Sequence, residues 1–559
     1  MKDKNKILFK EYLELYETIF SFSNTKRSDL LVEVIYLLLE YQKLGYLYID
    51  TKDMNKSINN ILITEEHIKE IYRNNWHKIK ESPLVISSNK IFSKNNYKQL
   101  NIILDILEKK NQSENTLLSS GVLTFNNKLD KYQLQAIRLL STHKVILIDG
   151  GPGTGKTSTI INILMNLVKE NKSINIGISA PTGKAVKRLK ESIDILNLNI
   201  NEKVLSSKSF MTLHKWLSTK DSISSEIKTL SKLDVFIVDE MSMVDLDIFR
   251  DLITRLNYKS TLILVGDKNQ LPPIESGSIW NYLINNLNNC GLVRLIKTYR
   301  NSGDIRTLSS YIKDNKIKLF INLITNLSEE SNVQYTNTSN IELPINIMNS
   351  IKKGQLYLLE KTKELQSKIK VSQTYDFSKH NLISGITSQI FNYINNNIIL
   401  CRTNIGTWGT EEVHKKILGN ESLVDLKSCI EGTPILCTKN QDDLGLSNGD
   451  IGFIISINKT KKILFNILSE DNEPIISLVD PSISSFFTPA LALTIHKAQG
   501  SESDNITVLW NEDLKKLLST KSDISYELKV EHEKQLLYTA ITRAKNKLEL
   551  FSFKDEINN

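Results

Sequence analysis

A glycine-rich octapeptide, GGPGTGKT at Gly150–Thr157, carries the clearest chemical signal in this sequence. It follows an apolar run with strand character, VILID at Val145–Asp149, and precedes a helix-like stretch that begins at Ser158. Glycines in this context let backbone N–H groups approach a phosphate chain, and the start of a helix adds positive potential. We expect Lys156 to reach the β- and γ-phosphates and the Thr157 hydroxyl to bind Mg²⁺. The pattern predicts a nucleoside triphosphate site formed by Gly150, Gly151, Pro152, Gly153, Thr154, Gly155, Lys156 and Thr157.

Two further apolar runs end in polar residues suited to phosphate chemistry. The run DVFIVD at Asp234–Asp239 ends in an acid and is followed by Glu240. We expect Asp239 to bind Mg²⁺ and Glu240 to polarise the attacking water, although two acids after a strand also occur in solvated turns. The run TLILVG at Thr261–Gly266 leads to Gln270, whose amide would contact the γ-phosphate or that water. These residues indicate a nucleoside triphosphatase and do not say what work the hydrolysis drives.

The elements that must position these residues follow from the spacing of the apolar runs. Between Thr124 and about Trp280, four β-branched runs alternate with helical stretches, the fourth being NIGISA at Asn175–Ala180. Buried strands of this kind, separated by helices, predict a doubly wound α/β domain with a parallel sheet. The expected fold class is therefore α/β.

The rest of the chain divides into three parts by pattern. Strand-like runs return at NIILC, ITVLW and KLELF and indicate a second α/β domain, within which 326–340 reads as a surface loop. Between them, about 430–487 has the short strands and turns of a small inserted β-module, with one turn at Asn448-Gly449 and another at Asp471-Asn472. Residues 1–115 are mostly helical in pattern and carry no catalytic motif.

Composition and charge exclude several classes of protein. The chain has 559 residues, of which 40% are hydrophobic, so it is not wholly disordered. Its formal charge of +8 suits a polyanionic partner but decides little alone, and only 11 of the 71 basic residues are Arg. The four cysteines show no CxxC spacing, which disfavours a zinc site and indicates a reducing compartment. The most apolar run, Leu30–Tyr41, contains two glutamates and is too short to span a bilayer, so we expect a cytoplasmic protein without membrane contact.

Five further motifs occur in a fixed order along the chain and carry a resemblance. They are SAPTGKAVKRL, TLHKWL, GDKNQLPP, LTIHKAQGSESD and LYTAITRAKNKLEL. With the glycine-rich loop and the acidic strand end, this set resembles superfamily 1 DNA helicases. The resemblance implies two RecA-like domains, with ATP and Mg²⁺ in the cleft between them and single-stranded DNA crossing both.

The same resemblance implies roles for residues outside the phosphate loop. Gln133 matches the glutamine that reads the adenine edge, and Arg300 and Arg543 match the arginines that reach the γ-phosphate. Gly500 and Glu502 match a segment near the γ-phosphate and ribose. The residues that match contacts to the DNA backbone are Thr182, Thr212, His214, Thr494 and His496. Three aromatic residues fit base stacking and core packing equally well, namely Trp216, Phe486 and Phe487.

Three more segments narrow the resemblance to the RecD family, the alpha subunits of exodeoxyribonuclease V. They lie at Glu81–Tyr97, Arg402–Ile417 and Gly432–Gly452. The family implies a 5′→3′ helicase of the 1B group that acts with RecB-like and RecC-like subunits on single- and double-stranded DNA ends during double-strand break repair by homologous recombination. It also implies that the β-insert is SH3-like. Tyr132 departs from the family pattern, which weakens the adenine assignment, and 305–395 matches poorly.

On this resemblance the chain divides into four domains. They are a helical partner-docking domain at 1–115, a first RecA-like domain at 116–290, a second at 291–429 and 488–559, and an SH3-like insert at 430–487. Because 14 residues follow Lys545 and no acidic cluster lies outside the ATP motifs, we expect any nuclease activity in a partner subunit. Two alternatives stay open: a stand-alone 1B helicase, and a structural subunit with a degenerate ATPase site.

Overall fold

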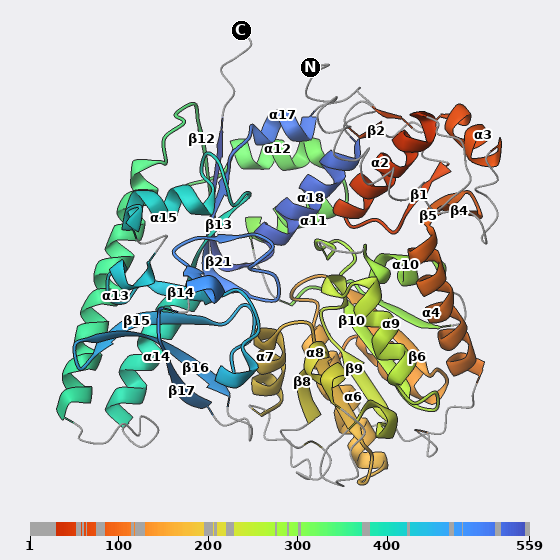
Figure 1. The fold of residues 1–559 in the computed structure, drawn as a ribbon, viewed down its shortest axis with the longest axis horizontal. Coiled ribbons are helices and arrows are strands. Elements are labelled where there is room, and N and C mark those ends of the chain that lie inside the picture. The colour runs from red at the N-terminus through yellow and green to blue at the C-terminus, as the bar shows by residue number, and fades with distance from the viewer. Residues whose placement is uncertain are drawn as a thin grey trace. The chain divides into compact units, whose positions relative to one another are not determined.

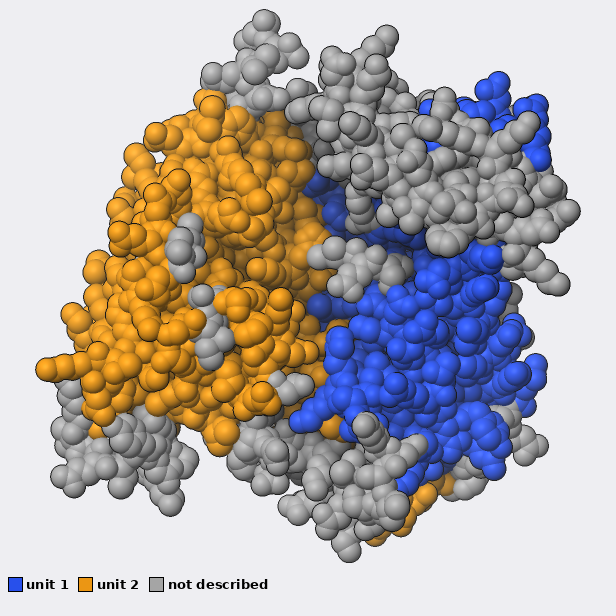
Figure 2. Space-filling model, in the orientation of Figure 1, with its two compact units in different colours: residues 1–150, 213–295, 520–535 blue, residues 151–212, 296–519, 536–559 orange. Residues whose placement is uncertain are grey.

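The structure is a computed structural model (Figure 1), in which the chain forms two compact units. Unit 1 comprises residues 1–150, 213–295 and 520–535, and unit 2 comprises 151–212, 296–519 and 536–559 (Figure 2). The structure describes residues 29–51, 57–58, 61–62, 64–73, 84–112, 117, 129–194, 205, 209–219, 229–273, 277–287, 290–299, 303–371, 381–421, 425–468, 474–482, 484–519 and 527–553.

A parallel sheet of buried strands forms the centre of unit 1. The strands of this sheet that belong to unit 1 lie in the order β11-β6-β10-β9, and in register Leu264 of β10 pairs with Leu147 of β6 and Val238 of β9. Every residue of β6, β9 and β10 is buried, which explains why these runs are almost wholly apolar. The sheet confirms the predicted parallel α/β class for this region. The bounds are β6 Val145–Gly150, β9 Val235–Val238, β10 Thr261–Gly266 and β11 Gly291–Leu295.

Four short helices accompany this sheet in unit 1, and α9 and α10 each begin at a side-chain cap. α9 begins after Asp245, whose side chain accepts the backbone N–H of Ile248, and α10 begins after Ser278, whose hydroxyl accepts the N–H of Asn281. Such caps satisfy backbone donors that have no partner within the helix. The bounds are α5 Lys131–Arg138, α8 Leu213–Ser218, α9 Leu246–Arg255 and α10 Ile279–Asn286.

The N-terminal part of unit 1 combines helices with a small sheet. The apolar run at Leu30–Tyr41 lies within a helix, α2, whose inner face packs with Ile49, Ile71 and Leu84. The three-stranded antiparallel sheet β1-β5-β4 was not predicted, because strands of three or four residues give too little periodicity to detect. The bounds are α2 Asp29–Lys43, β1 Tyr48–Asp50, β2 Ser57–Ile58, β3 Ile61–Leu62, α3 Glu65–Arg73, β4 Leu84–Ser87, β5 Lys90–Ser93 and α4 Lys94–Gln112.

A buried lysine fixes α4 to the rest of unit 1. Lys110 is fully buried, and its Nζ donates to the carbonyl oxygens of Asn257, Tyr258 and Ser260 at 2.5, 3.2 and 3.0 Å and to the Ser260 hydroxyl at 3.0 Å. These oxygens belong to the turn between α9 and β10, so one amino group donates hydrogen bonds to several oxygens of the same turn. Burial, helped by the nearby charge of Lys144, lowers the pKa of Lys110 to about 7.

A second parallel sheet lies in unit 2, in the order β12-β21-β20-β13-β19. It confirms the second α/β region that the runs NIILC, ITVLW and KLELF predicted. The prediction of a surface loop at 326–340 was wrong, because β12 lies within it and pairs in parallel with β21. β12 is an edge strand whose one buried residue is Val333, so its sequence is mostly polar. The bounds are β12 Val333–Thr338, β13 Asn397–Cys401, β19 Leu493–Thr494, β20 Ser503–Trp510 and β21 Ala544–Phe553.

The other elements of unit 2 include a helical hairpin, α13 and α14, that packs against a β-module. The module is an antiparallel sheet in the order β17-β16-β15-β14-β18, and Phe453 and Leu464 on one of its faces pack with Ile390 of α14 and Leu365 of α13. A small β-module was predicted here, and so was its turn at Asn448-Gly449, where Gly449 has φ +97°. The turn predicted at Asp471-Asn472 lies outside the described residues.

The remaining described elements of unit 2 are helices and strands from several separate stretches of the chain. They are α6 Lys156–Glu170, β7 Ile176–Ala180, α7 Gly183–Asp194, β8 Phe210–Thr212, α11 Asp304–Lys313, α12 Ile317–Thr325, α13 Ile345–Val371, α14 Asn381–Asn396, α15 Thr410–Leu418, β14 Pro434–Cys437, β15 Ile451–Ile457, β16 Thr460–Leu468, β17 Pro474–Val479, β18 Phe487–Pro489 and α17 Leu514–Ser519. One helix, α18 Glu527–Ile541, continues from unit 1 into unit 2. Among the described helices, none combines the length and the apolar character that crossing a bilayer requires.

Replacing Lys110 by Met should destabilise unit 1 by about 3 kcal/mol, because the side-chain volume is kept while four oxygens of the turn after α9 each lose a donor. Chemical unfolding monitored by intrinsic fluorescence would measure this loss. The matched control is Lys109→Met, since Lys109 is the exposed neighbour on the same helix. Equal stability of the two variants would show that the lysine does not secure the turn.

Candidate functional site

The glycine-rich loop leaves β6 at Gly150 and enters α6 at Lys156. Gly153 and Gly155 have φ of +72° and +84°, in the left-handed region that disfavours residues with a Cβ. Thr154 is buried and donates from its hydroxyl to the carbonyl of Gly151 at 2.8 Å, which tightens the loop. Lys156 Nζ donates to the same carbonyl over a long 3.4 Å contact. The loop therefore places its lysine over its own main chain, at the start of a helix.

The acidic pair after β9 is held in an unusual conformation. Asp239 Oδ1 accepts the backbone N–H of Glu240 at 2.8 Å, and Glu240 itself has φ +55°. A left-handed non-glycine residue outside Asn and Asp is uncommon, and such strain clusters at functional sites. Glu240 Oε2 is buried and has no hydrogen-bond partner among the described residues. A buried carboxylate oxygen without a donor is costly, so this atom is available to a ligand or a water.

The loop after β10 is tied to the strand that precedes the glycine-rich loop. Asp149, at the end of β6, accepts the backbone N–H of Lys268 at 3.0 Å. Asp267 is fully buried and accepts the N–H of Asn269 at 3.0 Å, and Gln270 is buried to 2% exposure. A hydrogen bond thus connects the end of β6 to the loop that carries Gln270. The role of Asp149 was missed, although an acid at the end of an otherwise apolar run was a usable signal.

Gln133 accepts a hydrogen bond that was not predicted from the sequence. Its Oε1 accepts the backbone N–H of Asp130 at 3.1 Å, while Asp130 Oδ1 accepts the N–H groups of Tyr132 and Gln133. This is a capping box at the start of α5, and the sequence D-x-x-Q was the signal that could have revealed it. The carboxamide oxygen predicted to face adenine is engaged within its own helix terminus.

Within unit 2, several predicted residues lie around the turn at Gly500. Gly500 has φ +73°, and a Cβ built there would lie 3.6 Å from the Thr182 hydroxyl. Arg543 is buried, and its guanidinium donates to the carbonyl oxygens of Ser501 at 3.1 Å and Thr539 at 3.4 Å. Gly500, Thr182 and Arg543 are therefore brought close together.

The segment that precedes the other predicted arginine contacts the glycine-rich loop. The backbone N–H of Tyr299 donates to the carbonyl of Gly153 at 2.7 Å. Arg300 follows Tyr299 in the chain and lies outside the described residues. The segment that leads to Arg300 is therefore hydrogen-bonded to the glycine-rich loop through Tyr299.

Glu502 pairs with an arginine that was not predicted as a site residue. Its Oε2 lies 2.5 Å from Nη2 of Arg188, which belongs to α7. The side chain of Glu502 is 11% exposed and that of Arg188 is 35% exposed, so the carboxylate is the more buried partner of the ion pair. A contact to ribose would compete with Arg188 for the lone pairs of this carboxylate oxygen. The scarcity of Arg in the chain was the signal that could have drawn attention to Arg188.

The start of α7 also packs against the β-module. A Cβ built at Gly183 would lie 2.6 Å from Ser447 Oγ, so only glycine allows this approach. Burial lowers the pKa of Lys184 to about 8, although Asp450 opposes that shift. Burial likewise raises the pKa of Asp450, against the Ser447 N–H and the charges of Lys187 and Lys184.

The predicted DNA-contacting residues lie at the ends of elements. Thr182 caps α7, because its hydroxyl accepts the N–H of Ala185 at 3.2 Å. Thr212 ends β8, and Thr494 ends β19 and accepts the N–H of Lys497 at 3.4 Å. His214 is exposed on α8 and His496 is partly exposed.

Two of the three aromatic candidates for base stacking are core residues. Trp216 is fully buried and packs edge-on against Phe236, with ring centroids 5.5 Å apart. Phe487 is buried in the β-module beside Phe465. Phe486 is partly buried against the same cluster. Core packing therefore accounts for Trp216 and Phe487.

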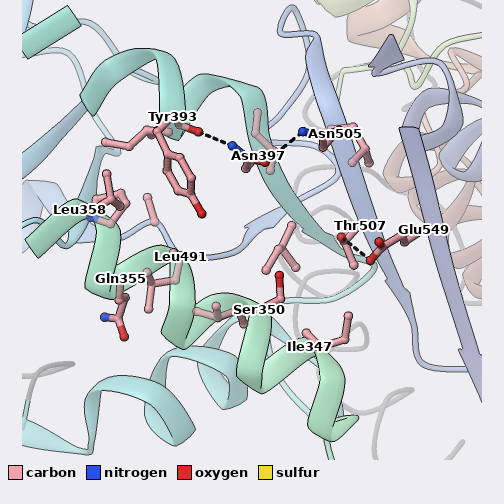
Figure 3. A pocket seen from close by; sticks show the side chains of 18 of the residues that line it. Ile347, Ser350, Gln355, Leu358, Tyr393, Asn397, Leu491, Asn505, Thr507 and Glu549 are labelled. Carbon is pink, nitrogen blue, oxygen red and sulfur yellow. Dashed lines mark hydrogen bonds between the residues drawn. The ribbon is translucent and has the colours of Figure 1, made fainter. Parts of the chain in front are cut away.

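A cavity of about 340 Å³ lies elsewhere in unit 2 (Figure 3). It is formed by α13, the end of α14 and the amino ends of β13 and β20, where Asn505 Nδ2 donates to Asn397 Oδ1 at 3.0 Å. None of the predicted site residues lines it. Ligands of open parallel sheets bind at the carboxyl ends of the strands, which is the opposite edge. The cavity is therefore distinct from the nucleotide residues.

Comparisons with known proteins identify the family to which the chain belongs. The family model described as "AAA domain" matches residues 133–276. RecBCD enzyme subunit RecD of Buchnera aphidicola from Schizaphis graminum is 31% identical over 537 residues, covering 85% of this chain and 82% of the relative. The chain belongs to the RecD family. The corresponding protein of Buchnera aphidicola from Acyrthosiphon pisum is 30% identical over 518 residues, covering 85% of this chain and 81% of the relative.

As a RecD-family protein, the chain is an ATP-dependent DNA helicase, and the prediction of that family and activity is confirmed. Among solved structures, a Bacteroides Pif1 bound to single-stranded DNA matches with a TM-score of 0.39 and 15% identity, covering 76% of this chain and 92% of that one. The AAA match spans the glycine-rich loop and the acidic strand end, so nucleotide binding by this region follows from the family.

A buried histidine predicts acid sensitivity beside one of the RecD-family motifs. His414 of α15 is 4% exposed, and its Nε2 accepts the N–H of Ala492, just before β19, at 3.3 Å. Burial lowers the pKa of His414 from 6.5 to about 4. The unfolded chain therefore binds a proton that the folded chain excludes, so stability should fall as pH drops from 6.5 to 4, by about 3 kcal/mol.

Urea unfolding of unit 2 between pH 4 and 7 would measure this slope. His414→Gln should flatten it, since the amide does not titrate in this range. The control is His214→Gln at an exposed position, which should leave the slope unchanged. An unaltered slope in His414→Gln would assign the acid sensitivity to other groups.

Proposed function

We propose that the chain is the 5′→3′ motor subunit of a RecBCD-type complex, in which it assembles with RecB-like and RecC-like subunits and unwinds DNA ends for recombination in the cytoplasm. The support is family membership together with an unbroken, ordered set of motor motifs. The relatives that establish the family are named as subunits of the RecBCD enzyme. We assign nuclease activity to a partner, because the motifs of this chain serve a motor.

The nucleotide chemistry rests on groups that match the needs of a magnesium–ATP complex. Asp239 and Thr157 offer carboxylate and hydroxyl oxygens, the ligand types that Mg²⁺ favours, and they end a strand and begin a helix. Beside Asp239, the buried Oε2 of Glu240 lacks a protein partner among the described residues, as expected for a group that faces a ligand shell. The ion would neutralise charge between the β- and γ-phosphates.

The hydrolytic step is assigned to residues of the chain by the motifs to which they belong. Lys156 exchanges its long contact to the Gly151 carbonyl for phosphate oxygens, and Glu240 orients the attacking water and accepts its proton. Gln270 contacts the same water or the γ-phosphate, and Arg300 and Arg543 stabilise the charge on the transferred group. Gln133 contacts the adenine base. Gly500 and Glu502 contact the γ-phosphate and ribose, and ribose competes with Arg188 for the Glu502 carboxylate.

The DNA track is assigned to side chains that grip phosphates without reading bases. Hydroxyl and imidazole groups at helix and strand ends suit movement along any sequence. This role belongs to Thr182, Thr212, His214, Thr494 and His496. We retain two RecA-like domains at 116–290 and at 291–429 with 488–559, an SH3-like module at 430–487, and a partner-docking domain at 1–115.

The docking role of 1–115 rests on two features of its described residues. It forms its own apolar core around α2, α3 and the small sheet. It supplies no residue to the nucleotide or DNA motifs, so its exposed faces are free for assembly. α3, for example, presents Glu66, Lys69 and Arg73 to solvent.

The observation that carries the catalytic proposal is the conformation of Glu240. Replacing Glu240 by Gln should lower DNA-stimulated ATP turnover by roughly 10²–10⁴-fold, because the amide cannot accept a proton from water. Binding of a fluorescent ADP analogue and the melting temperature should be unchanged. The control is Asp247→Asn, since Asp247 is an exposed acid in the same unit. Full turnover by Glu240→Gln would exclude Glu240 as the catalytic base.

Polarity distinguishes the proposed motor from helicases that move in the other direction. The purified chain should unwind duplexes carrying a 5′ single-stranded overhang and leave those with a 3′ overhang paired. A gel-based strand-separation assay with ATP measures unwinding of both substrates. Unwinding from the 3′ overhang alone would contradict the proposal.

Adding the RecB-like and RecC-like proteins of the same cell should yield one complex that contains all three chains.

A further inference from the structure

We infer that the turn Leu44–Leu47 of the N-terminal region, here called the clasp, positions the loop that carries Gln270, so that the N-terminal region acts on ATP turnover as well as on assembly. This inference rests on the role proposed for Gln270. The clasp lies at the carboxyl end of α2, just before β1, and Figure 1 shows both elements beside α10.

The clasp has a fixed shape of its own. The N–H of Gly45 donates to the carbonyl of Gln42 at 2.8 Å and the N–H of Tyr46 donates to that of Tyr41 at 2.9 Å. With φ +84° at Gly45, this pair of bonds is the Schellman arrangement that ends helices. The turn is therefore rigid before it meets anything else.

The clasp holds the loop after Gln270 at both of its described ends. On one side, a Cβ built at Gly45 would lie 2.1 Å from Cγ and 2.3 Å from Cβ of Pro272. On the other side, a Cβ built at Gly277 would lie 2.7 Å from Leu47 Cδ2 and 3.0 Å from the carbonyl oxygen of Tyr46. Two glycines are thus required by close approach, one on each partner.

A hydrogen bond fixes the register of this contact. The N–H of Ser278 donates to the carbonyl of Gly45 at 2.8 Å, and the Ser278 hydroxyl in turn caps α10. Pro272 is two residues after Gln270, and Leu271 between them is fully buried. With so short a connection, a displacement of Pro272 is transmitted to Gln270.

The N-terminal region is itself anchored, so the clasp acts as part of a rigid body. Lys110 binds the turn after α9, as described above. Lys90 Nζ donates to Asn286 Oδ1 at 2.8 Å and lies 4.4 Å from the ring centroid of Tyr48 and 5.3 Å from that of Tyr282. A partner that shifts the N-terminal region would therefore move the Gln270 loop.

Gly45→Ala tests the clasp in the full-length chain. An added methyl group must move Pro272 by more than about 1 Å to reach ordinary contact, and a misplacement of about 1 Å already costs on the order of 10²-fold in rate. We expect kcat for DNA-stimulated ATP hydrolysis to fall by roughly tenfold to a hundredfold, with KM for ATP and affinity for a fluorescent ADP analogue unchanged. The matched control is Gly419→Ala, since Gly419 has φ +83° and nothing within 4 Å, so it introduces backbone strain without a collision.

A second variant guards against a folding defect in Gly45→Ala. Gly277→Ala meets the flexible end of Leu47 at 2.7 Å and the Tyr46 carbonyl oxygen at 3.0 Å, a milder collision than that at Gly45, so it should fold and show a smaller fall in kcat with the same unchanged KM. Wild-type kcat in both variants would overturn the inference. So would a loss of ADP affinity that parallels the loss of turnover, because that indicates general structural damage.

A double-mutant cycle with Gln270→Ala separates this inference from the function on which it rests. If the clasp acts through Gln270, adding Gly45→Ala to Gln270→Ala should lower kcat no further. Multiplicative losses would show that the clasp acts elsewhere and overturn the inference. Wild-type kcat in Gln270→Ala alone would instead contradict the proposed role of Gln270.

Discussion

Strands buried on both faces can carry polar side chains only where they end, and this constraint organises the first unit. β6, β9 and β10 are buried along their whole length, so their backbone groups are satisfied by the sheet and their side chains are apolar. The polar residues predicted to act on the nucleotide therefore follow the carboxyl ends of these strands, as Asp239 follows β9 and Gln270 follows β10. Asp149 is the instructive exception, because its buried carboxylate accepts the N–H of Lys268 and so joins two of these ends.

The N-terminal region is integrated into the first unit by contacts that a detachable docking module would not need. Lys110 supplies a donor to a turn far along the chain, and Gly45 and Pro272 approach too closely for any side chain larger than hydrogen at position 45. Burying an amino group is costly unless every proton finds an acceptor, which is why four oxygens surround it. Docking and support of the motor are compatible roles, since the anchoring contacts leave the outer face of α3 exposed.

In the second unit, polar groups around Gly500 are held by one another. Arg543 donates to backbone carbonyls and Glu502 pairs with Arg188, so both are satisfied without a nucleotide. Each of these side chains is therefore anchored to another part of unit 2, Glu502 to α7 and Arg543 to the turn after Gly500.

The sequence by itself determined the parts of this protein that depend on neighbouring residues. The glycine-rich loop, the apolar strands before it and after it, the buried helix at Leu30–Tyr41 and the turn at Asn448-Gly449 are all local patterns, and the structure has each of them. The family could be recognised for the same reason, since its motifs are short and contiguous. Many of the predicted site residues fall at the ends of these local elements.

Only the tertiary structure decided which distant groups meet. Lys110 hydrogen-bonds to a turn 150 residues away in the sequence, and Arg188 pairs with a carboxylate 314 residues away. Sequence periodicity carries no information about contacts over such separations. The polar strand at Val333–Thr338 looked like a loop because an edge strand needs little apolar surface, and only its pairing with β21 defines it. Local geometry is encoded residue by residue, whereas the partner of a buried charge or an edge strand is fixed by how the whole chain packs.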